Sequence, residues 1–391
     1  MTRRRWSWRG GVLLLLACGV TSAAVSGQGR AQQTGAPLTG VPRFEVDPAW
    51  PKLPADFSWG QVIGIFADAQ GHVWTSSRSR IAEWAPDGTL VQSWDARGPN
   101  GNWSTIHGLF VDHNGFVWTN ARESHLTVKF TKAGQVAMVI GRYNETGGSN
   151  DTTLMGRPSD IWVDPADNEV FVADGYGNRR VIVFDGATGK YLRHWGAYGR
   201  RPEDPARTTS TAAAESTGAQ SSLAVPTEPP RQLRVPHGIV GSRDGLIYVA
   251  DRANNRIQVF RQSGEFVRET ILRPHCGVEE KATWAPGRPC GTEAAFSIAF
   301  SHDGPQNYLY VADGGTHVIT VLRRGDLEVV DEFAGPGVEP GQLGRPHNIT
   351  VDPSGNIFVA EAAGPEVKDP RTGQTRQAGH RAQKFRFTGT R

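Results

Sequence analysis

A pattern of short strands and turns recurs six times along this chain of 391 residues, with copies that begin near residues 63, 107, 159, 237, 296 and 347. Each copy reads as an apolar strand, an Asp-x-x-Gly turn, a second apolar strand ending in small and acidic residues, and a third strand ending in Phe or Trp. Short β-branched and aromatic strands at this spacing are typical of a propeller. No helical period separates the copies, so the sequence predicts an all-β, six-bladed β-propeller.

Residues 42–391 are expected to form one domain, because a propeller grows by adding blades. A propeller blade has four strands, but the sixth copy contains only three, at residues 348–352, 356–361 and 382–387. The segment 42–48 precedes the first copy and is an unassigned strand. We expect Phe44 to Asp47 to pair beside Lys384 to Phe387 and close the ring, so that no sheet edge is left bare.

Residues 1–31 are predicted to be a bacterial-type export signal, with a charged start and an apolar run at 10–17 that is too short to span a bilayer. The adjacent arginines also allow a twin-arginine signal. We expect cleavage between Ala23 and Ala31 and a secreted or periplasmic protein without an integral membrane segment. Lipid attachment at Cys18 is the alternative, because residues 15–18 resemble a lipoprotein cleavage box.

The formal net charge of the full chain is +3, and the predicted signal carries Arg3, Arg4, Arg5 and Arg9. Without these four arginines the formal charge is −1, which argues against a nucleic-acid partner. We expect a monomer. Residues 200–231, between the third and fourth copies, are rich in Thr, Ser, Ala and Pro and are predicted to be a surface insertion.

Cys276 and Cys290 lie in one connection between the fourth and fifth copies. In an exported protein an even pair in one loop is most simply a disulfide. The rival interpretation is a pair of ligands to a structural metal, but no second Cys or His pair completes such a site.

Three histidines, His107, His237 and His347, occupy one column of the repeat in the second, fourth and sixth copies. Alternate blades of a six-bladed ring are about 120° apart, so these side chains can converge on the axis. Three imidazoles with an open fourth position are the outline of a catalytic zinc site. A single histidine at a strand start is usually a packing residue, but three in alternate copies favour metal binding.

The residues just after the second strand share a rim with the histidines, because the second strand runs back to the face where the first began. This class contains Arg78, Arg122 and Arg252, each fifteen residues after its column, and Tyr176 in the third copy. We therefore expect a polar site at this mouth of the ring. The alternative to a functional role is a structural one, in which Asp and Arg at blade turns hold neighbouring loops in place. Asp174, Asp251 and Asp313 are interpreted in that way.

The repeat pattern matches the NHL repeat family. With the three histidines, Tyr176, Arg78 and Arg252 in place, most of the chain resembles the peptidyl-α-hydroxyglycine α-amidating lyase family, the lyase half of the machinery that makes C-terminal peptide amides. Segments that resemble this family include residues 60–64, 157–160, 174–179, 235–237, 251–256 and 346–349.

The resemblance implies zinc held by His107, His237 and His347, with Tyr176 as general base. Arg78 and Arg252 are implied to bind the carboxylate of a small amide or peptide substrate. It also implies a structural calcium on the axis that takes the backbone carbonyls near Ile65 and Leu109. The reaction splits the C–N bond of a carbinolamide into an amide and glyoxylate.

Three residues depart from the family pattern. Asn348 stands where the family usually has an acidic calcium ligand, which weakens the calcium prediction. Arg345 stands where members tend to be apolar, and Gly177 stands where the animal enzymes have a disulfide cysteine. These changes leave the three histidines intact and bear instead on the identity of the substrate.

Two other functions remain open from the sequence. The first is a non-catalytic NHL propeller that binds a peptide, glycan or protein on the same mouth. The second is a calcium-dependent propeller hydrolase such as a lactonase, which relies on axial carboxylates and amides. Metal content separates these interpretations, because a pure binding protein has no use for a buried site of three histidines.

Overall fold

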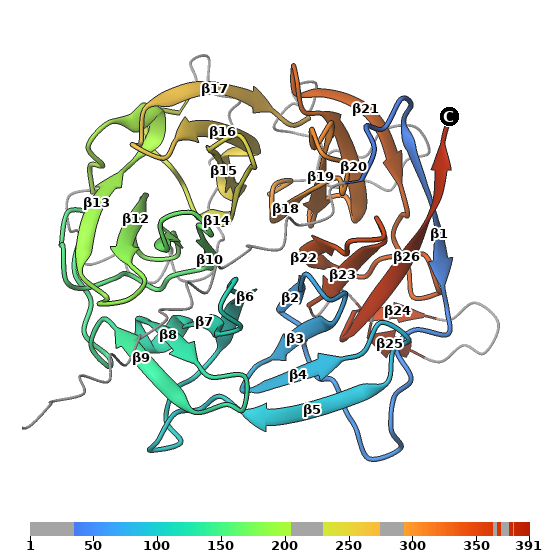
Figure 1. Ribbon diagram of the computed structural model, residues 1–391, viewed down its shortest axis with the longest axis horizontal. Coiled ribbons are helices and arrows are strands. Elements are labelled where there is room, and N and C mark those ends of the chain that lie inside the picture. The colour runs from blue at the N-terminus through green and yellow to red at the C-terminus, as the bar shows by residue number, and fades with distance from the viewer. Residues whose placement is uncertain (1–34, 205–229, 274–292, 363–365, 369–374, 378) are drawn as a thin grey trace, which may run out of the picture. The chain divides into compact units, whose positions relative to one another are not determined.

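Six four-stranded antiparallel sheets form a ring in the computed structural model, which describes residues 35–204, 230–273, 293–362, 366–368, 375–377 and 379–391 (Figure 1). The first strand of each sheet lies nearest the axis, and neighbouring first strands contact one another all round the ring. The prediction of an all-β, six-bladed propeller is confirmed. The predicted export signal, most of the 200–231 insertion, and Cys276 and Cys290 lie outside the described residues.

Five blades use four consecutive strands, counted from the axis outward. Blade 1 contains β2 (Gly64–Ala67), β3 (Val73–Ser77), β4 (Arg80–Trp84) and β5 (Leu90–Asp95). Blade 2 contains β6 (Ile106–Val111), β7 (Val117–Ala121), β8 (Leu126–Phe130) and β9 (Val136–Ile140). Blade 3 contains β10 (Asp160–Val163), β11 (Glu169–Asp174), β12 (Arg180–Asp185) and β13 (Tyr191–Trp195). Blade 4 contains β14 (Pro236–Gly241), β15 (Leu246–Asp251), β16 (Arg256–Arg261) and β17 (Phe266–Ile271). Blade 5 contains β18 (Ser297–Phe300), β19 (Tyr308–Asp313), β20 (Val318–Arg323) and β21 (Glu328–Phe333).

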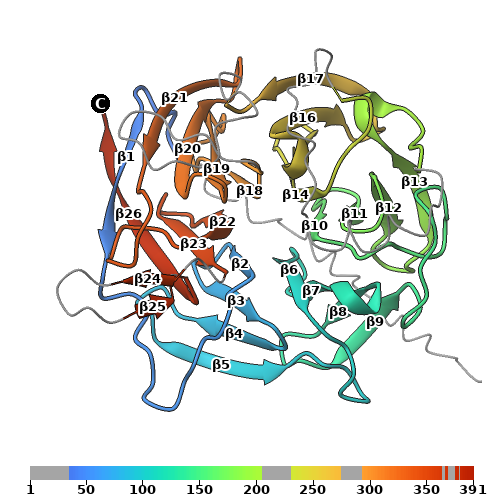
Figure 2. The ribbon, with the colours of Figure 1, turned by 180° about the vertical axis from the view of Figure 1, so that it is seen from behind.

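The sixth blade joins both ends of the propeller. Its order is β22 (Pro346–Val351), β23 (Ile357–Glu361), β26 (Arg381–Thr390) and β1 (Pro42–Asp47), and the view from behind shows β1 beside β26 as well (Figure 2). Phe44 pairs with Phe387 and Asp47 with Lys384, so the predicted closure of the ring is confirmed. A hairpin of β24 (Glu366–Lys368) and β25 (Thr375–Gln377), which the repeat pattern did not predict, lies between β23 and β26 in the chain.

The Asp-x-x-Gly turns join the first and second strands through hydrogen bonds from their own backbone. In blade 2, Oδ1 of Asp112 accepts the backbone N–H groups of Asn114 and Phe116, and Oδ2 accepts the indole N–H of Trp118 at 2.8 Å. Gly115 has φ +80°, a left-handed conformation that glycine adopts at little cost. The motif therefore serves the turn, at the opposite end of the first strand from its histidine column.

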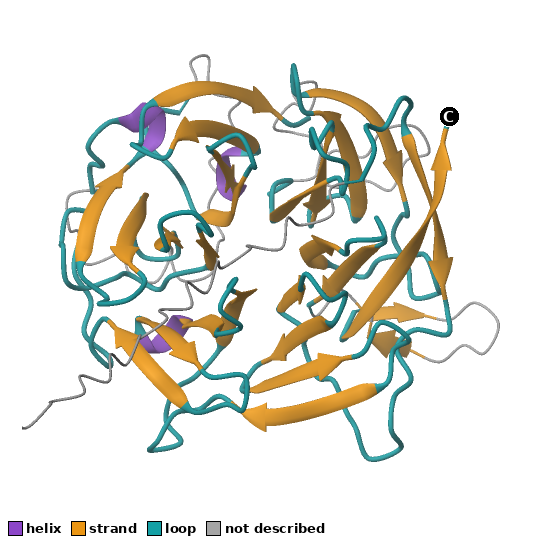
Figure 3. Ribbon diagram, viewed as in Figure 1, coloured by secondary structure: helices purple, strands orange, loops and turns teal. Residues whose placement is uncertain are grey.

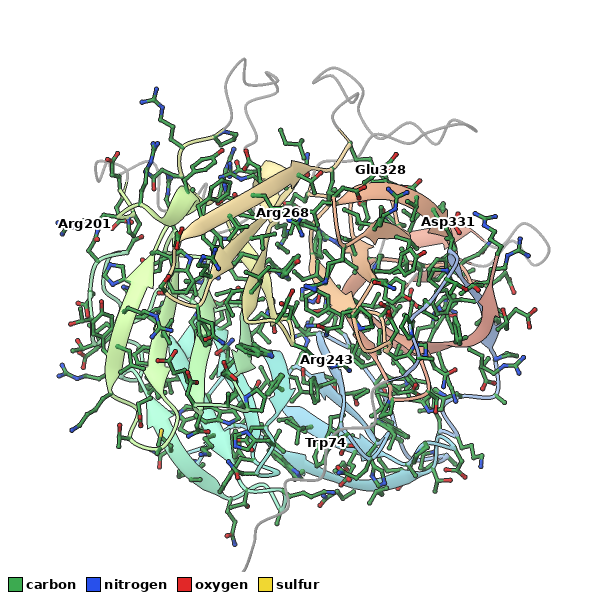
Figure 4. All side chains as sticks on the ribbon, turned by 45° about the horizontal axis from the view of Figure 1, so that its top comes forward. Trp74, Arg201, Arg243, Arg268, Glu328 and Asp331 are labelled. Atoms are coloured by element: carbon green, nitrogen blue, oxygen red, sulfur yellow. The ribbon has the colours of Figure 1, made fainter. Side chains whose placement is uncertain are left out.

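Apolar side chains fill the spaces between neighbouring blades. Trp74 lies among the inner strands whereas Arg201 lies at the outer edge (Figure 4). The acidic residues that end the second strands are structural, as interpreted from the sequence. Arg256 pairs with Asp251 at 2.7 Å and Arg180 with Asp174 at 2.9 Å, with all four side chains fully buried.

Helical structure in the described ranges is confined to three short 3₁₀ turns (Figure 3), η1 (Arg122–Ser124), η2 (Ala197–Gly199) and η3 (Arg252–Asn254). None of the described helices is long and apolar enough to cross a membrane. The turns η1 and η3 follow the second strands of blades 2 and 4, and each begins with an arginine of the predicted rim. They position these arginines beside the histidine columns.

Candidate metal centre

His107, His237 and His347 converge on the axis from β6, β14 and β22. Their ring centroids form a nearly equilateral triangle with sides of 4.8 to 4.9 Å. The side chains are buried, with residue exposures of 2 to 6%. One ring nitrogen from each lies within 4.8 Å of those of the other two. The structure thus brings together the three predicted zinc ligands.

The other ring nitrogen of each histidine faces a backbone carbonyl of the next blade. The Nδ1–O distances are 2.6 Å for His107 to Ser159, 2.7 Å for His237 to Phe296 and 2.8 Å for His347 to Ile63. A carbonyl oxygen can only accept, so each Nδ1 carries the hydrogen and each Nε2 presents its lone pair. Hydrogen bonds of this kind orient and polarise metal-binding imidazoles, so the donor set fits zinc.

The electrostatic surroundings keep these imidazoles neutral. Burial, together with the nearby charge of Arg252, lowers the pKa of His347 to about 3. Burial also holds the pKa values of His107 and His237 well below their usual range, with a contribution from the His347 ring. Because a metal binds neutral imidazole, little proton competition is expected at neutral pH.

Acid should destabilise the metal-free protein through the same histidines. In the unfolded chain they take up protons near pH 6.5, whereas their folded pKa values are lower. The free energy of unfolding should therefore be highest above pH 6.5 and fall as the pH drops toward the folded values, by up to about 1.4 kcal/mol per pH unit for each histidine. Urea unfolding of chelator-treated protein between pH 7.5 and 4.5 measures this slope. His347→Gln should show a shallower slope than wild type, and parallel slopes would contradict the prediction.

Tyr176 places its hydroxyl beside two of the three histidines. The oxygen lies 2.9 Å from Nε2 of His237 and 3.2 Å from Nε2 of His107. The preceding Gly175 makes this approach possible, because a Cβ there would come within 1.9 Å of the Pro236 carbonyl oxygen. The turn after β11 can therefore pack against the start of β14 and bring the phenol to the site.

Two arginines of the predicted rim contact Tyr176. Nη1 of Arg252 lies 3.0 Å from the phenolic oxygen, and the Arg122 guanidinium lies 4.4 Å from the ring centroid. Arg157, from the approach to β10, lies 6.0 Å from the same centroid and shares Glu123 with Arg122. The phenol is thus enclosed by positive charge on more than one side.

A second group of charges lines the mouth on the blade 5 and blade 6 side. Arg252 pairs with Glu293 at 2.7 Å and stacks 4.0 Å from the Phe296 ring centroid. Arg345 lies 5.3 Å from the same centroid and 3.5 Å from Glu293. Burial, with Arg252 nearby, lowers the pKa of Arg345. Phe296 therefore supports two guanidinium groups with its ring and orients His237 with its carbonyl.

Arg78 differs from the other predicted rim residues. It is exposed, with φ +46°, and its carbonyl accepts the N–H of Ile106, next to His107. Among the residues that the structure describes, none is joined to its side chain by a hydrogen bond or ion pair. Its role as a carboxylate binder stays a prediction.

The predicted calcium ligands Ile65 and Leu109 lie on the neighbouring first strands β2 and β6, with buried side chains. Asn348 stands at the repeat position that directly follows the histidine position, and it accepts a hydrogen bond from Ser297 at 3.3 Å. Asp160 supplies the carboxylate in this column, and burial raises its pKa to about 7. The axial calcium stays a prediction.

A second group of side chains that could bind a metal ion lies in blade 1 and consists of Asp68, His72 and Glu83. Glu83 accepts from Nδ1 of His72 at 2.7 Å and from Lys132 at 2.7 Å, while Asp68 caps the turn after β2. The lysine ammonium already occupies the cation position. This group is a satisfied ion-pair network.

Sequence reasoning missed Arg157, Glu123 and Glu293, and it did not assign a role to Arg345. A finer alignment of the repeats contains part of the signal, because Arg157 and Arg345 both stand two residues before their columns. Neither glutamate recurs at the equivalent position of another copy, so periodicity carries no signal for them.

The comparisons with known proteins agree with this fold. A family model described as NHL repeat matches residues 233–260. NHL repeat-containing protein 3 of Homo sapiens is 23% identical over 350 residues, which are 83% of each chain. Peptidyl-glycine alpha-amidating monooxygenase B of Xenopus laevis is 28% identical over 228 residues, or 58% of this chain and 21% of that protein. The chain thus spans about a fifth of the length of the amidating enzymes that it matches.

Two solved structures show the same fold. A streptogramin B lyase aligns with a TM-score of 0.51 and 14% identity, covering 88% of this chain and 98% of that one. A gluconolactonase from Xanthomonas campestris aligns with a TM-score of 0.52 and 14% identity, covering 90% of this chain and 98% of that one. At this identity the similarity concerns the fold alone.

Proposed function

From its place among six-bladed propellers with NHL repeats, and its distant similarity to the peptidylglycine amidating enzymes, we propose that this chain is an exported, zinc-dependent lyase. Its reaction cleaves the C–N bond of a carbinolamide to give an amide and glyoxylate. The observation that carries the proposal is the convergence of three buried histidines on the axis, with the Tyr176 hydroxyl within 3.2 Å of Nε2 of both His107 and His237. The distant sequence similarity to the amidating enzymes supports a catalytic role.

His107, His237 and His347 would hold the zinc ion. When bound, zinc would acidify a hydroxyl group that lies against it. The three histidines are buried, and the backbone carbonyls hold them in one tautomer, so the site is organised before substrate arrives.

Tyr176 and Arg252 supply the remaining chemistry. The substrate unit N–CH(OH)–COO⁻ must lose its hydroxyl proton as the C–N bonding electrons pass to nitrogen. Tyr176, as its phenolate, would accept that proton and then, as the phenol, return it to the nitrogen, which leaves as the neutral amide. Arg252 lies beside the phenolic oxygen and can hold the substrate carboxylate through its guanidinium.

The test is product release by zinc-loaded protein. With α-hydroxyhippurate, we expect glyoxylate and benzamide to appear in equal amounts, and a peptidyl-α-hydroxyglycine should likewise yield glyoxylate and a peptide amide. Chelator-treated protein should release neither, which controls for spontaneous breakdown of the substrates.

Two results would overturn the proposal in different ways. Stoichiometric zinc without glyoxylate release from either substrate would remove the lyase activity and leave the metal site standing. Failure to bind any transition metal would remove both, and would favour the non-catalytic binding propeller.

A further inference from the structure

The described part of the mouth holds more positive than negative charge. Four arginines face two glutamates there, which leaves two positive charges on the protein alone; the residues are Arg122, Arg157, Arg252, Arg345, Glu123 and Glu293. Zinc in the histidine site would add to this excess. An excess of positive charge of this kind attracts anionic ligands.

The excess charge on one side of the mouth is located at Arg345. Oε2 of Glu293 lies 2.7 Å from Arg252 but 3.5 Å from Arg345, so the carboxylate is committed mainly to Arg252. The Arg345 side chain is 40% exposed, while that of Arg252 is 8% exposed. Arg345 therefore offers a guanidinium at the entrance, beyond the arginine that reaches the phenol.

Arg252 also has an unused donor. Its Nη1 serves Tyr176 and its Nη2 serves Glu293, but the buried Nε has no partner among the described residues. A buried donor without an acceptor is costly, and a carboxylate is the acceptor that a guanidinium binds best. Arg252 thus has capacity for one anionic group, and Arg345 for another.

We propose that the mouth recognises a substrate with two carboxylates, one held by Arg252 over the histidines and the second held by Arg345. This inference rests on the proposed function, because it assigns the first carboxylate to the carbinolamide carbon. The second carboxylate then belongs to the acyl side of the scissile C–N bond, as in an acidic residue or a dicarboxylic acyl group. Arg345 is a specificity-determining residue in this arrangement.

Calorimetric binding of unreactive acids to zinc-loaded protein tests the inference without turnover. The probes are succinate, glutarate and adipate, compared with the monocarboxylate butyrate. The best diacid should bind the wild type about ten- to hundredfold more tightly than butyrate, the effect of one added charge-assisted hydrogen bond. Arg345→Met, which removes the charge and keeps the length, should reduce the preference to less than about threefold.

Two control variants separate the role of Arg345 from a general effect of charge. Arg345→Lys retains the charge and should keep a preference for the diacid. Arg142→Met removes an exposed arginine that pairs with Glu145, and should bind every probe as the wild type does. Absence of a diacid preference in the wild type, or its survival in Arg345→Met, would overturn the inference. If the wild type prefers the diacid but releases no glyoxylate, only the lyase proposal fails.

Discussion

His237→Ala should lose nearly all bound zinc, from about one ion per chain to below about 0.1 after dialysis, because two imidazoles rarely hold zinc against solvent. The remaining ligands cannot compensate, since His107 and His347 are each held by a backbone carbonyl of the next blade. Lyase turnover should fall about 10²- to 10⁴-fold, because zinc contributes several kcal/mol of transition-state stabilisation. Elemental analysis and glyoxylate release measure the two effects.

The matched control is His113→Ala, which removes an exposed histidine in the turn after β6. It should retain both zinc and turnover. Because His237 is buried, its loss also removes packing and the Nδ1 bond to Phe296, so near-ultraviolet circular dichroism should confirm a folded ring. If a folded His237→Ala protein keeps the zinc content of the wild type, the three-histidine site is wrong.

The ring and the histidine column could be predicted because both are periodic. Each blade repeats a strand and turn pattern set by local residues, and the closing strand 42–48 followed from the count of strands in the sixth copy. Equivalent positions in alternate blades must meet near the axis, whatever the details of packing. The convergence of His107, His237 and His347 therefore followed from their column alone.

The parts that could not be predicted are made by backbone atoms or by loops between copies. The odd copies hold Ile63, Ser159 and Phe296 in the histidine column, three side chains with no chemistry in common. Their shared contribution is the carbonyl oxygen that orients each imidazole, which every residue type possesses. The residue types at these three positions therefore could not predict the carbonyl groups that hold the histidines.

Arg78 and Arg252 show why equivalence in the repeat does not imply equivalence in space. Both stand fifteen residues after their columns, yet Arg252 begins the 3₁₀ turn η3 and reaches the phenol, while Arg78 is exposed in a left-handed turn. The local backbone after the second strand decides where the guanidinium goes. That backbone varies from one blade to another, because the turn residues vary.

Tyr176→Phe should separate catalysis from metal binding. The change deletes one hydroxyl and no imidazole, so zinc content and the fold should match those of the wild type. Turnover should fall about 10²- to 10⁴-fold, the usual contribution of a general base, whereas KM should change little because Arg252 still binds the carboxylate. Tyr191→Phe is the matched control, since it removes a hydroxyl that contacts His194 at 2.9 Å in the outer strand of blade 3.

Three possible outcomes for Tyr176→Phe distinguish the roles open to this phenol. A folded, zinc-loaded variant with greatly reduced kcat is the expected result for a group that moves the substrate proton. Loss of zinc would make Tyr176 a fourth ligand instead, which its position 2.9 Å from Nε2 of His237 would explain. A kcat within about threefold of the wild type would exclude it as the base, because general base catalysis is worth far more. The proton would then have to leave by way of solvent, and the rim arginines would serve binding alone.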